Sequence, residues 1–196
     1  MNKVMKKKYV VATVRPCVVN RKKHSGFLKD KPHREFLDLA VAYWMPADEE
    51  GSRNVEMVTN ELLQEVSLTE SELHILAMAN VNENLSFQAL GKGSMLTGKV
   101  PPMICVTNKE LILGAGAMAS EYVLAYLASL YEKDLLILPS STDEFMVVPV
   151  CDKEWEIEYY REVVKNANQS DLVPPEVWLS DNVYYYSRKL RKLIIV

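Results

Sequence analysis

Residues 135–149 read LLILPSSTDEFMVVP, two short apolar runs joined by a small polar turn. Each run, 135–138 and 145–148, is too short for a globular helix and is bounded by turn residues, which predicts two β-strands. Strands that are apolar on both faces are typical of central strands covered on both sides. The polar side chains between the runs can hydrogen-bond their own backbone, as a tight turn without glycine requires. We therefore predict a core hairpin around which the sheet is built.

The turn of this hairpin is also a candidate site. It presents Ser140, Ser141 and Asp143, and loops held by rigid strands often carry function. The simpler interpretation is a structural turn, because these residue types are the usual residues of tight connections. The residues alone leave both interpretations open.

Length and composition bound the class of protein. With 196 residues, of which 48% are hydrophobic, the chain can bury one sizeable core, so a single domain over 1–196 is expected. Within it we expect a mobile basic loop at about 20–32 and a flexible segment at about 82–100. No apolar run approaches the length of a membrane span, and the N-terminus lacks the pattern of a signal peptide.

The three cysteines are too few and too widely spaced for a disulfide framework or a zinc site, and no CxxC motif occurs. Reduced thiols of this kind indicate a cytoplasmic protein. The sequence predicts no metal site and no cofactor.

Charge is distributed unevenly along the chain. The net charge is −3, but residues 1–34 hold eleven Lys or Arg and one acid, a net +10. Residues 35–187 carry −17. A basic region can attract nucleic acid, phosphate or an acidic protein surface. The alternative is that the basic ends only neutralise the acidic body of the fold.

Hydrophobic periodicity predicts strands and helices without regular βαβ alternation, which is typical of an α+β domain. We expect one mixed, mainly antiparallel sheet with three or so helices packed on it. The first strand is placed at a sheet edge, because Pro16 cannot donate to a ladder. A capping box at Thr69 and Glu72 begins one helix, with His74 on its exposed side. Strands are predicted at 9–19, 33–45, 55–59, 103–107, 111–118 and 183–187 besides the hairpin, and helices at 69–80, 121–131 and 153–167, with a helical turn at the start of 60–66.

Polar residues at several predicted strand ends form a candidate ligand site. If the ends meet, their side chains could bind a phosphate or a divalent ion. The set comprises His33, Arg34, Asp38, Ser140, Ser141, Asp143, Ser180 and Asp181.

Four segments together resemble the bacterial family known as domain of unknown function 5688: PHREFLDLAV at 32–41, PPMICVTNKELILGAG at 101–116, DLLILPSSTDEFMVVP at 134–149 and VWLSDNVYYYS at 177–187. The resemblance implies stand-alone proteins of gut bacteria, some of them in mobile elements, and no activity. It also implies a histidine where this chain has Asp143, and another where it has Asn182. Both departures argue against histidine-based catalysis or a metal site at these positions.

Two functional hypotheses follow from the sequence. The favoured one is a non-catalytic binding protein that engages an acidic protein or nucleic acid through its basic N-terminal region, since no recognised catalytic motif is present. The alternative is a hydrolase or a small-ligand or phosphate-binding enzyme with its site at the 140–143 turn. The residues expected to bind an anion are Lys6, Lys7, Lys8, Arg21, Lys22 and Lys23.

Overall fold

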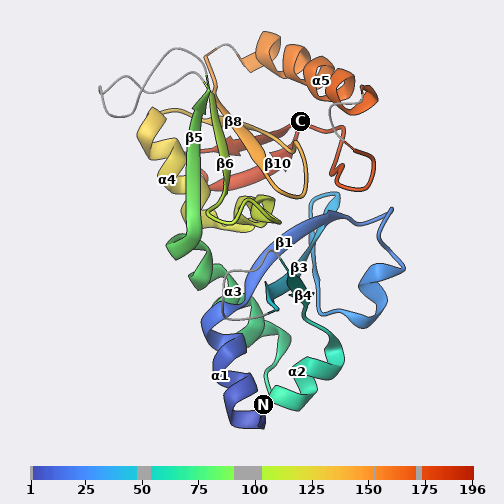
Figure 1. The fold of residues 1–196 in the computed structure, drawn as a ribbon. Coiled ribbons are helices and arrows are strands. Elements are labelled where there is room, and N and C mark those ends of the chain that lie inside the picture. Colours follow the sequence, from blue (N-terminus) through green and yellow to red (C-terminus); the bar gives the residue numbers. More distant parts are fainter. Residues whose placement is uncertain (1, 48–53, 91–102, 152, 171–173) are drawn as a thin grey trace.

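A computed structural model describes residues 2–47, 54–90, 103–151, 153–170 and 174–196 (Figure 1). Helices and antiparallel sheets make up these residues, so the predicted α+β class is confirmed. The prediction of one sheet with three or so helices is wrong, because the described residues contain two sheets and more than three helices. The two helices that begin at 60 and 70 lead the chain away from the first sheet before the second begins.

The larger sheet is built on the predicted hairpin. β7 (Leu135–Leu138) and β8 (Phe145–Pro149) pair antiparallel, and the strand order β10, β9, β7, β8, β6, β5 places them at the centre. Leu135 and Ile137 enter the main core, whereas Leu136 and Leu138 pack in a second cluster with the helix α5 (Lys153–Gln169). The prediction of a central hairpin covered on both faces is confirmed. The other strands are β5 (Leu85–Leu90), β6 (Met103–Asn108), β9 (Tyr184–Ser187) and β10 (Lys192–Ile195).

The smaller sheet has β3 (Leu39–Pro46) at its centre. β1 (Arg15–Asn20) pairs along one edge, while β2 (Arg34–Phe36) and β4 (Val55–Met57) pair with opposite ends of the other edge. The single strand predicted at 33–45 is therefore a hairpin, whose turn holds Leu37 at a φ of 55°. Asp38 lies in that turn and not within a strand.

The N-terminal segment differs most from the sequence prediction. Residues 9–13 belong to a helix, α1 (Lys3–Thr13), and the strand begins only at Arg15. The Asn2 side chain caps the helix by accepting a hydrogen bond from Met5 N at 3.0 Å. At the other end, the side-chain amide of Asn80 donates to the carbonyl groups of Val11 and Val14 at 3.1 and 2.9 Å. Asn80 thus supplies hydrogen bonds to carbonyl groups that have no partner within the helix. The β-branched residues of this segment favour a strand and give no sign of that distant partner.

The strand predicted at 111–118 is also wrong, since Gly114–Ala119 form a 3-10 helix, η3. A Cβ at Gly116 would lie 2.0 Å from the carbonyl oxygen of Pro16, so the absence of a side chain lets η3 rest directly on β1.

The remaining helices agree with the sequence prediction. α4 (Glu121–Tyr131) occurs where expected, and α3 (Glu70–Asn84) begins with the predicted capping box at Thr69. α2 (Asn60–Val66) is a full helix where only an opening helical turn was expected. The segment predicted as flexible at about 82–100 contains the end of α3 and β5, while its flexibility stays a prediction and residues 91–100 lie outside the described residues. Segment 20–32 contains turns and the 3-10 helix η1 (Phe27–Asp30), while its predicted mobility stays a prediction.

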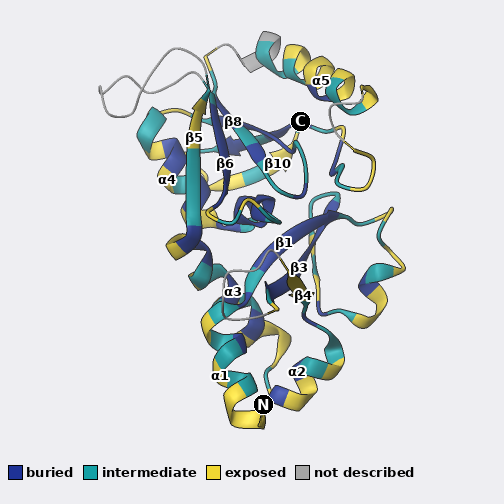
Figure 2. Cartoon of the chain, viewed as in Figure 1, coloured by how far each residue is buried: buried dark blue, intermediate teal, exposed yellow. Residues whose placement is uncertain are grey.

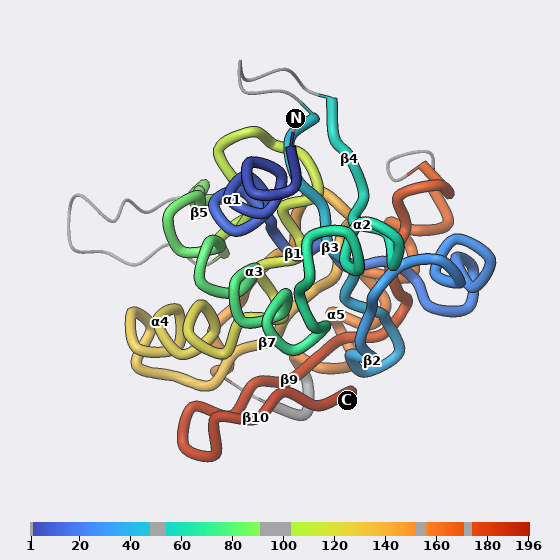
Figure 3. The backbone as a smooth tube through the Cα atoms, turned by 90° about the horizontal axis from the view of Figure 1, so that it is seen from below, coloured from blue at the N-terminus to red at the C-terminus, as the bar shows by residue number. Residues whose placement is uncertain are grey.

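One hydrophobic core reaches both sheets. Val18 and Tyr43 from the smaller sheet belong to the same buried cluster as Ile137 and Phe145 from the larger one. Figure 2 shows this buried zone running through the strands, with exposed residues concentrated on the outer faces of the helices. The view from below places β9 and β10 at one margin of the molecule and α1 and α2 over the smaller sheet (Figure 3). The core therefore holds both sheets in one packing unit.

Candidate functional site

Asp38 brings two of the predicted strand ends together. Its carboxylate accepts hydrogen bonds from Ser180 Oγ at 2.6 Å, Asn182 Nδ2 at 2.9 Å and Tyr184 OH at 2.7 Å. Burial, reinforced by this carboxylate, raises the pKa of Tyr184 above its usual range, so the phenol stays a hydrogen-bond donor. Three donors occupy the two oxygens of Asp38, which makes the cluster a polar connection between the two sheets.

The loop that carries Ser180 is a junction of several elements, and we call residues 177–182 the junction loop. Leu179 O accepts a bond from Asn20 at 2.7 Å, and Ser180 O and Asp181 Oδ1 each accept one from Asn168 at 3.0 Å. The Nζ of Lys23 lies 3.4 Å from the centroid of the Trp178 ring. The junction loop is thus held by β1, α5 and the β2–β3 turn.

The 140–143 turn reaches the same loop through its main chain. Thr142 N donates to Val177 O at 2.9 Å, and Leu113 N donates to Asp143 Oδ1 at 2.8 Å. Ser141 Oγ accepts from Asp143 N at 3.2 Å, the self-bonded turn that the residue types predict. The carboxylate of Asp143 therefore holds the segment before η3, while Ser140 is half-buried beside it.

His33 and Arg34 do not join this junction. His33 Nδ1 lies 2.8 Å from Lys31 O on an exposed loop, and Arg34 donates to Ser71 Oγ on α3 at 3.2 Å. The predicted eight-residue set is thus divided, with Asp38, Ser180, Asp181 and the 140–143 turn near the junction loop.

His74 is not exposed as expected from its helix position. It is half-buried, and its Nδ1 lies 3.0 Å from the hydroxyl of the buried Tyr43. Burial, helped by the positive charge of Arg34, lowers the pKa of His74.

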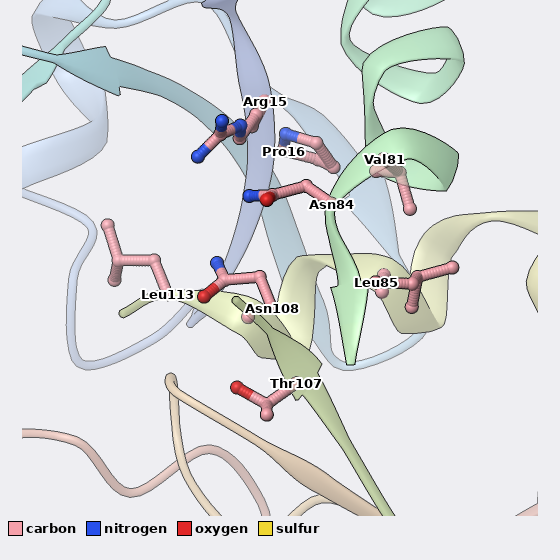
Figure 4. A pocket seen from close by; sticks show the side chains of 10 residues that line it. Arg15, Pro16, Val81, Asn84, Leu85, Thr107, Asn108 and Leu113 are labelled. Atoms are coloured by element: carbon pink, nitrogen blue, oxygen red, sulfur yellow. The ribbon is translucent and has the colours of Figure 1, made fainter. Parts of the chain in front are cut away.

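A small cavity lies where α3, η3 and the strands β1 and β6 meet. Figure 4 shows Arg15, Asn84 and Asn108 around this space. Arg15 Nη1 lies 3.0 Å from Glu110 Oε1, and the Asn84 amide donates to the same carboxylate. Burial opposes ionisation of Glu110, but these two neighbours lower its pKa overall. The cavity measures about 20 Å³, the space of a water molecule, which is far below the size of a substrate pocket.

Two of the three thiols, Cys17 and Cys105, are buried and offer little nucleophilic chemistry. Burial raises the pKa of Cys17 and of Cys105 to about 12, and the Glu144 carboxylate adds to the effect at Cys105. Cys151 is exposed and lies 2.9 Å from Lys133 Nζ. Within the described ranges, no group of three or more His, Cys, Asp or Glu side chains is placed to hold a metal ion.

The six predicted anion-binding residues lie at two separate places. Lys6, Lys7 and Lys8 are on α1, whereas Arg21, Lys22 and Lys23 follow the far end of β1. A six-residue strand separates them by about 20 Å. Two of the six have acidic partners: Lys6 pairs with Glu65 at 2.7 Å, and Arg21 with Glu35. The basic N-terminal region is therefore two patches.

An open groove runs between α1 and the end of α2, and we call it the α1–α2 groove. Val66 is fully buried at its floor, while Val4 is 64% exposed. Lys3 Nζ donates to Ser67 Oγ at 3.0 Å and Lys7 Nζ to Ser67 O at 3.1 Å, at the negative end of the α2 dipole. The groove has a volume of about 510 Å³ and is lined by Lys3, Val4, Lys7, Lys8, Val11, Val66 and Ser67.

Comparison with known proteins gives one result about identity. The model of the family of unknown function DUF5688 matches residues 1–188 of the 196-residue chain. The chain belongs to DUF5688. The resemblance carried by the four sequence segments is therefore confirmed, and membership of DUF5688 assigns no activity. No curated protein and no solved structure matches the chain.

Sequence reasoning missed the groove of this DUF5688 protein, although a signal was present. Positions 3, 4, 7, 8 and 11 lie on one face only if the segment is helical, and the sequence prediction began a strand at residue 9 and assigned no helix before it. The available cue was Asn2, a favoured N-cap residue, directly before the 11-residue segment that forms α1. Among the described helices, none combines the length and apolar character that a membrane span needs.

Proposed function

We propose that this DUF5688 protein is a non-catalytic binding protein that engages an acidic partner through the basic face of α1. The observation that carries the proposal is the α1–α2 groove, where three lysines border an apolar floor. Ammonium groups beside exposed apolar surface attract anionic side chains and gain from their desolvation. The same face lies at the outer end of the molecule, open to a partner (Figure 2).

The second basic patch, formed by Arg21, Lys22 and Lys23 after β1, is a weaker candidate for the binding surface than α1. Arg21 is paired with Glu35, and Lys23 lies over the ring of Trp178. Part of its charge is therefore already used inside the fold. We assign the binding role to α1 and a structural role to the patch after β1.

The enzymatic alternative has less support at the 140–143 turn. Its Thr142 and Asp143 bond to the main chain of neighbouring segments, and the 20 Å³ cavity is not lined by any of the eight predicted ligand-binding residues. These contacts favour a structural turn, so no catalytic function is proposed there.

A cytoplasmic location is part of the proposal. It is supported by three cysteines without disulfides, two of them buried, as in proteins of reducing compartments. The bacterial origin and the association with mobile elements, which the family resemblance implies, remain predictions.

The test is affinity capture from a lysate of the source organism, with and without nuclease, using the full chain. We expect retained acidic proteins to elute as salt rises, since the Debye length falls from about 8 Å at 0.15 M to about 3 Å at 1 M. The variant Lys3→Gln/Lys7→Gln/Lys8→Gln should lose them.

The matched control is Arg21→Gln/Lys22→Gln/Lys23→Gln, which removes the same charge from the far end of β1. We expect this variant to retain the acidic proteins. Equal retention by the two triple variants, or elution that does not respond to salt, would contradict the proposal.

A further inference from the structure

We propose that the occupant of the α1–α2 groove is an acidic amphipathic helix of a partner protein. This inference rests on the proposed function and specifies its partner. A helix of this kind places apolar side chains on one face and carboxylates beside them, which is the complement of an apolar floor with lysines at its rim.

The spacing of the groove residues fits a helix. Val4 and Val11 are seven residues apart on α1, which is two turns or about 10 Å along the axis. A partner helix lying along α1 meets these two positions with apolar residues about two turns apart on its own face. The groove volume of about 510 Å³ accommodates a few apolar side chains.

The lysines of the groove supply positive charge that is complementary to the carboxylates of the partner helix. Lys3, Lys7 and Lys8 lie on the same helical face as the two valines. Each ammonium group has three N–H donors, and Lys3 and Lys7 each direct one of them to Ser67. The remaining N–H groups can donate to a carboxylate, so flanking glutamates or aspartates on the incoming helix gain ion pairs.

The chemistry of the groove favours this occupant over nucleic acid or a lipid surface. Lysines can contact phosphates, but sites that hold bases add arginines or stacking aromatic side chains, and neither type lines the groove. A membrane-surface helix presents a continuous apolar face outward, whereas Val10 and Val14 of the α1 segment are buried against the protein and the exposed Val4 lies among lysines. The groove runs along one side of α1, with Val66 and Ser67 at the end of α2 as its other wall, so a rod lying beside α1 can fill it.

The test uses a fluorescent synthetic helix of about 15 residues with leucines on one face and glutamates elsewhere. A scrambled peptide of identical composition is the control probe, and a single-stranded oligonucleotide and anionic phosphatidylglycerol vesicles are the competing probes. The full-length protein is compared with Val4→Asp, which alters the exposed groove side chain, and with Ile75→Asp, an equally exposed residue on α3.

We expect the patterned peptide to bind about tenfold more tightly than the scrambled one. Val4→Asp should weaken it by at least about tenfold, and Ile75→Asp should leave it unchanged. Equal, lysine-dependent binding of both peptides would overturn the helix inference and leave the acidic-partner proposal intact. Preference for the oligonucleotide or the vesicles would overturn the inference, and failure of every acidic probe to bind would overturn both.

Discussion

At the residue scale, Asp38 is the side chain that joins the two sheets through hydrogen bonds. Replacement by alanine leaves the buried Ser180 and Tyr184 hydroxyls without their acceptor. Since hydrogen bonds to a charged group contribute more than neutral ones, we expect Asp38→Ala to lower the free energy of unfolding by about 3 kcal/mol. Urea denaturation measures this value. Glu83→Ala, at an exposed position on α3, is the control and should change it by less than about 0.5 kcal/mol.

His74 gives a pH-dependent prediction. Its pKa is lower in the folded protein than in the unfolded chain, so the unfolded chain takes up the proton first as pH falls. The stability that neutral His74 contributes is complete above about pH 6.5, the pKa of the unfolded chain, and is lost as pH falls from there through the lower pKa of the folded protein. We expect the wild type to lose more stability than His74→Gln between about pH 7 and 5.5. Parallel pH profiles from urea denaturation would refute this role of His74.

At the element scale, the contact between η3 and β1 depends on a missing side chain. A Cβ on Gly116 would meet the backbone of Pro16 at 2.0 Å, and neither element can shift easily within the core. We expect Gly116→Ala to cost about 3 kcal/mol or more.

Gly26 is the matched control for that substitution, since a Cβ added there would have nothing within 4 Å and the φ of Gly26 is −68°. Gly26→Ala should be neutral or stabilising by up to about 1 kcal/mol. Thermal unfolding of the two variants compares them directly. Equal losses would show that the η3 contact is not tight.

The elements also show how far the sequence predicts the fold. The hairpin 135–149 and the capping box at Thr69 are recognisable because their signals are local. α1 was not predicted, because its last turn is β-branched and its carbonyl groups are satisfied by Asn80, almost seventy residues away. The η3 helix depends likewise on Asp143, thirty residues further along the chain. Contacts with residues far along the chain stabilise these two elements, and the hydrophobic periodicity of a segment carries no information about such contacts.

The sequence likewise predicts one part of the candidate site and not the other. The sequence placed Asp38, Ser180 and the 140–143 turn in one set, and the junction loop does bring them close. It could not show that their polar atoms bond mainly to one another and to the main chain. The groove required α1 to be recognised as a helix, since its lysines and valines share a face only at helical spacing.

At the scale of the whole molecule, the shared core predicts cooperative unfolding. Val18 and Tyr43 from one sheet pack in the same cluster as Phe145 from the other. We expect tryptophan fluorescence, which includes the buried Trp44, and far-UV circular dichroism to give one coincident transition. Two separated transitions would contradict the single domain predicted over 1–196.

The positions of the two basic patches predict where a partner contacts the molecule. The two basic patches are about 20 Å apart, so a partner held by α1 does not need the residues that follow β1. Contacts should therefore be confined to the end of the molecule that carries α1 and α2 (Figure 1).

Binding of an acidic partner at the α1–α2 groove is tested most directly by photo-crosslinking in cells of the source organism, with a photoreactive amino acid placed at Val4 or, for comparison, at Ile75. Both positions are well exposed, at 64% and 67%. We predict that the Val4 position crosslinks to an acid-rich segment of a protein partner, and that this product disappears in Lys3→Gln/Lys7→Gln/Lys8→Gln. Crosslinks that are the same from both positions, or that persist without the lysines, would contradict it.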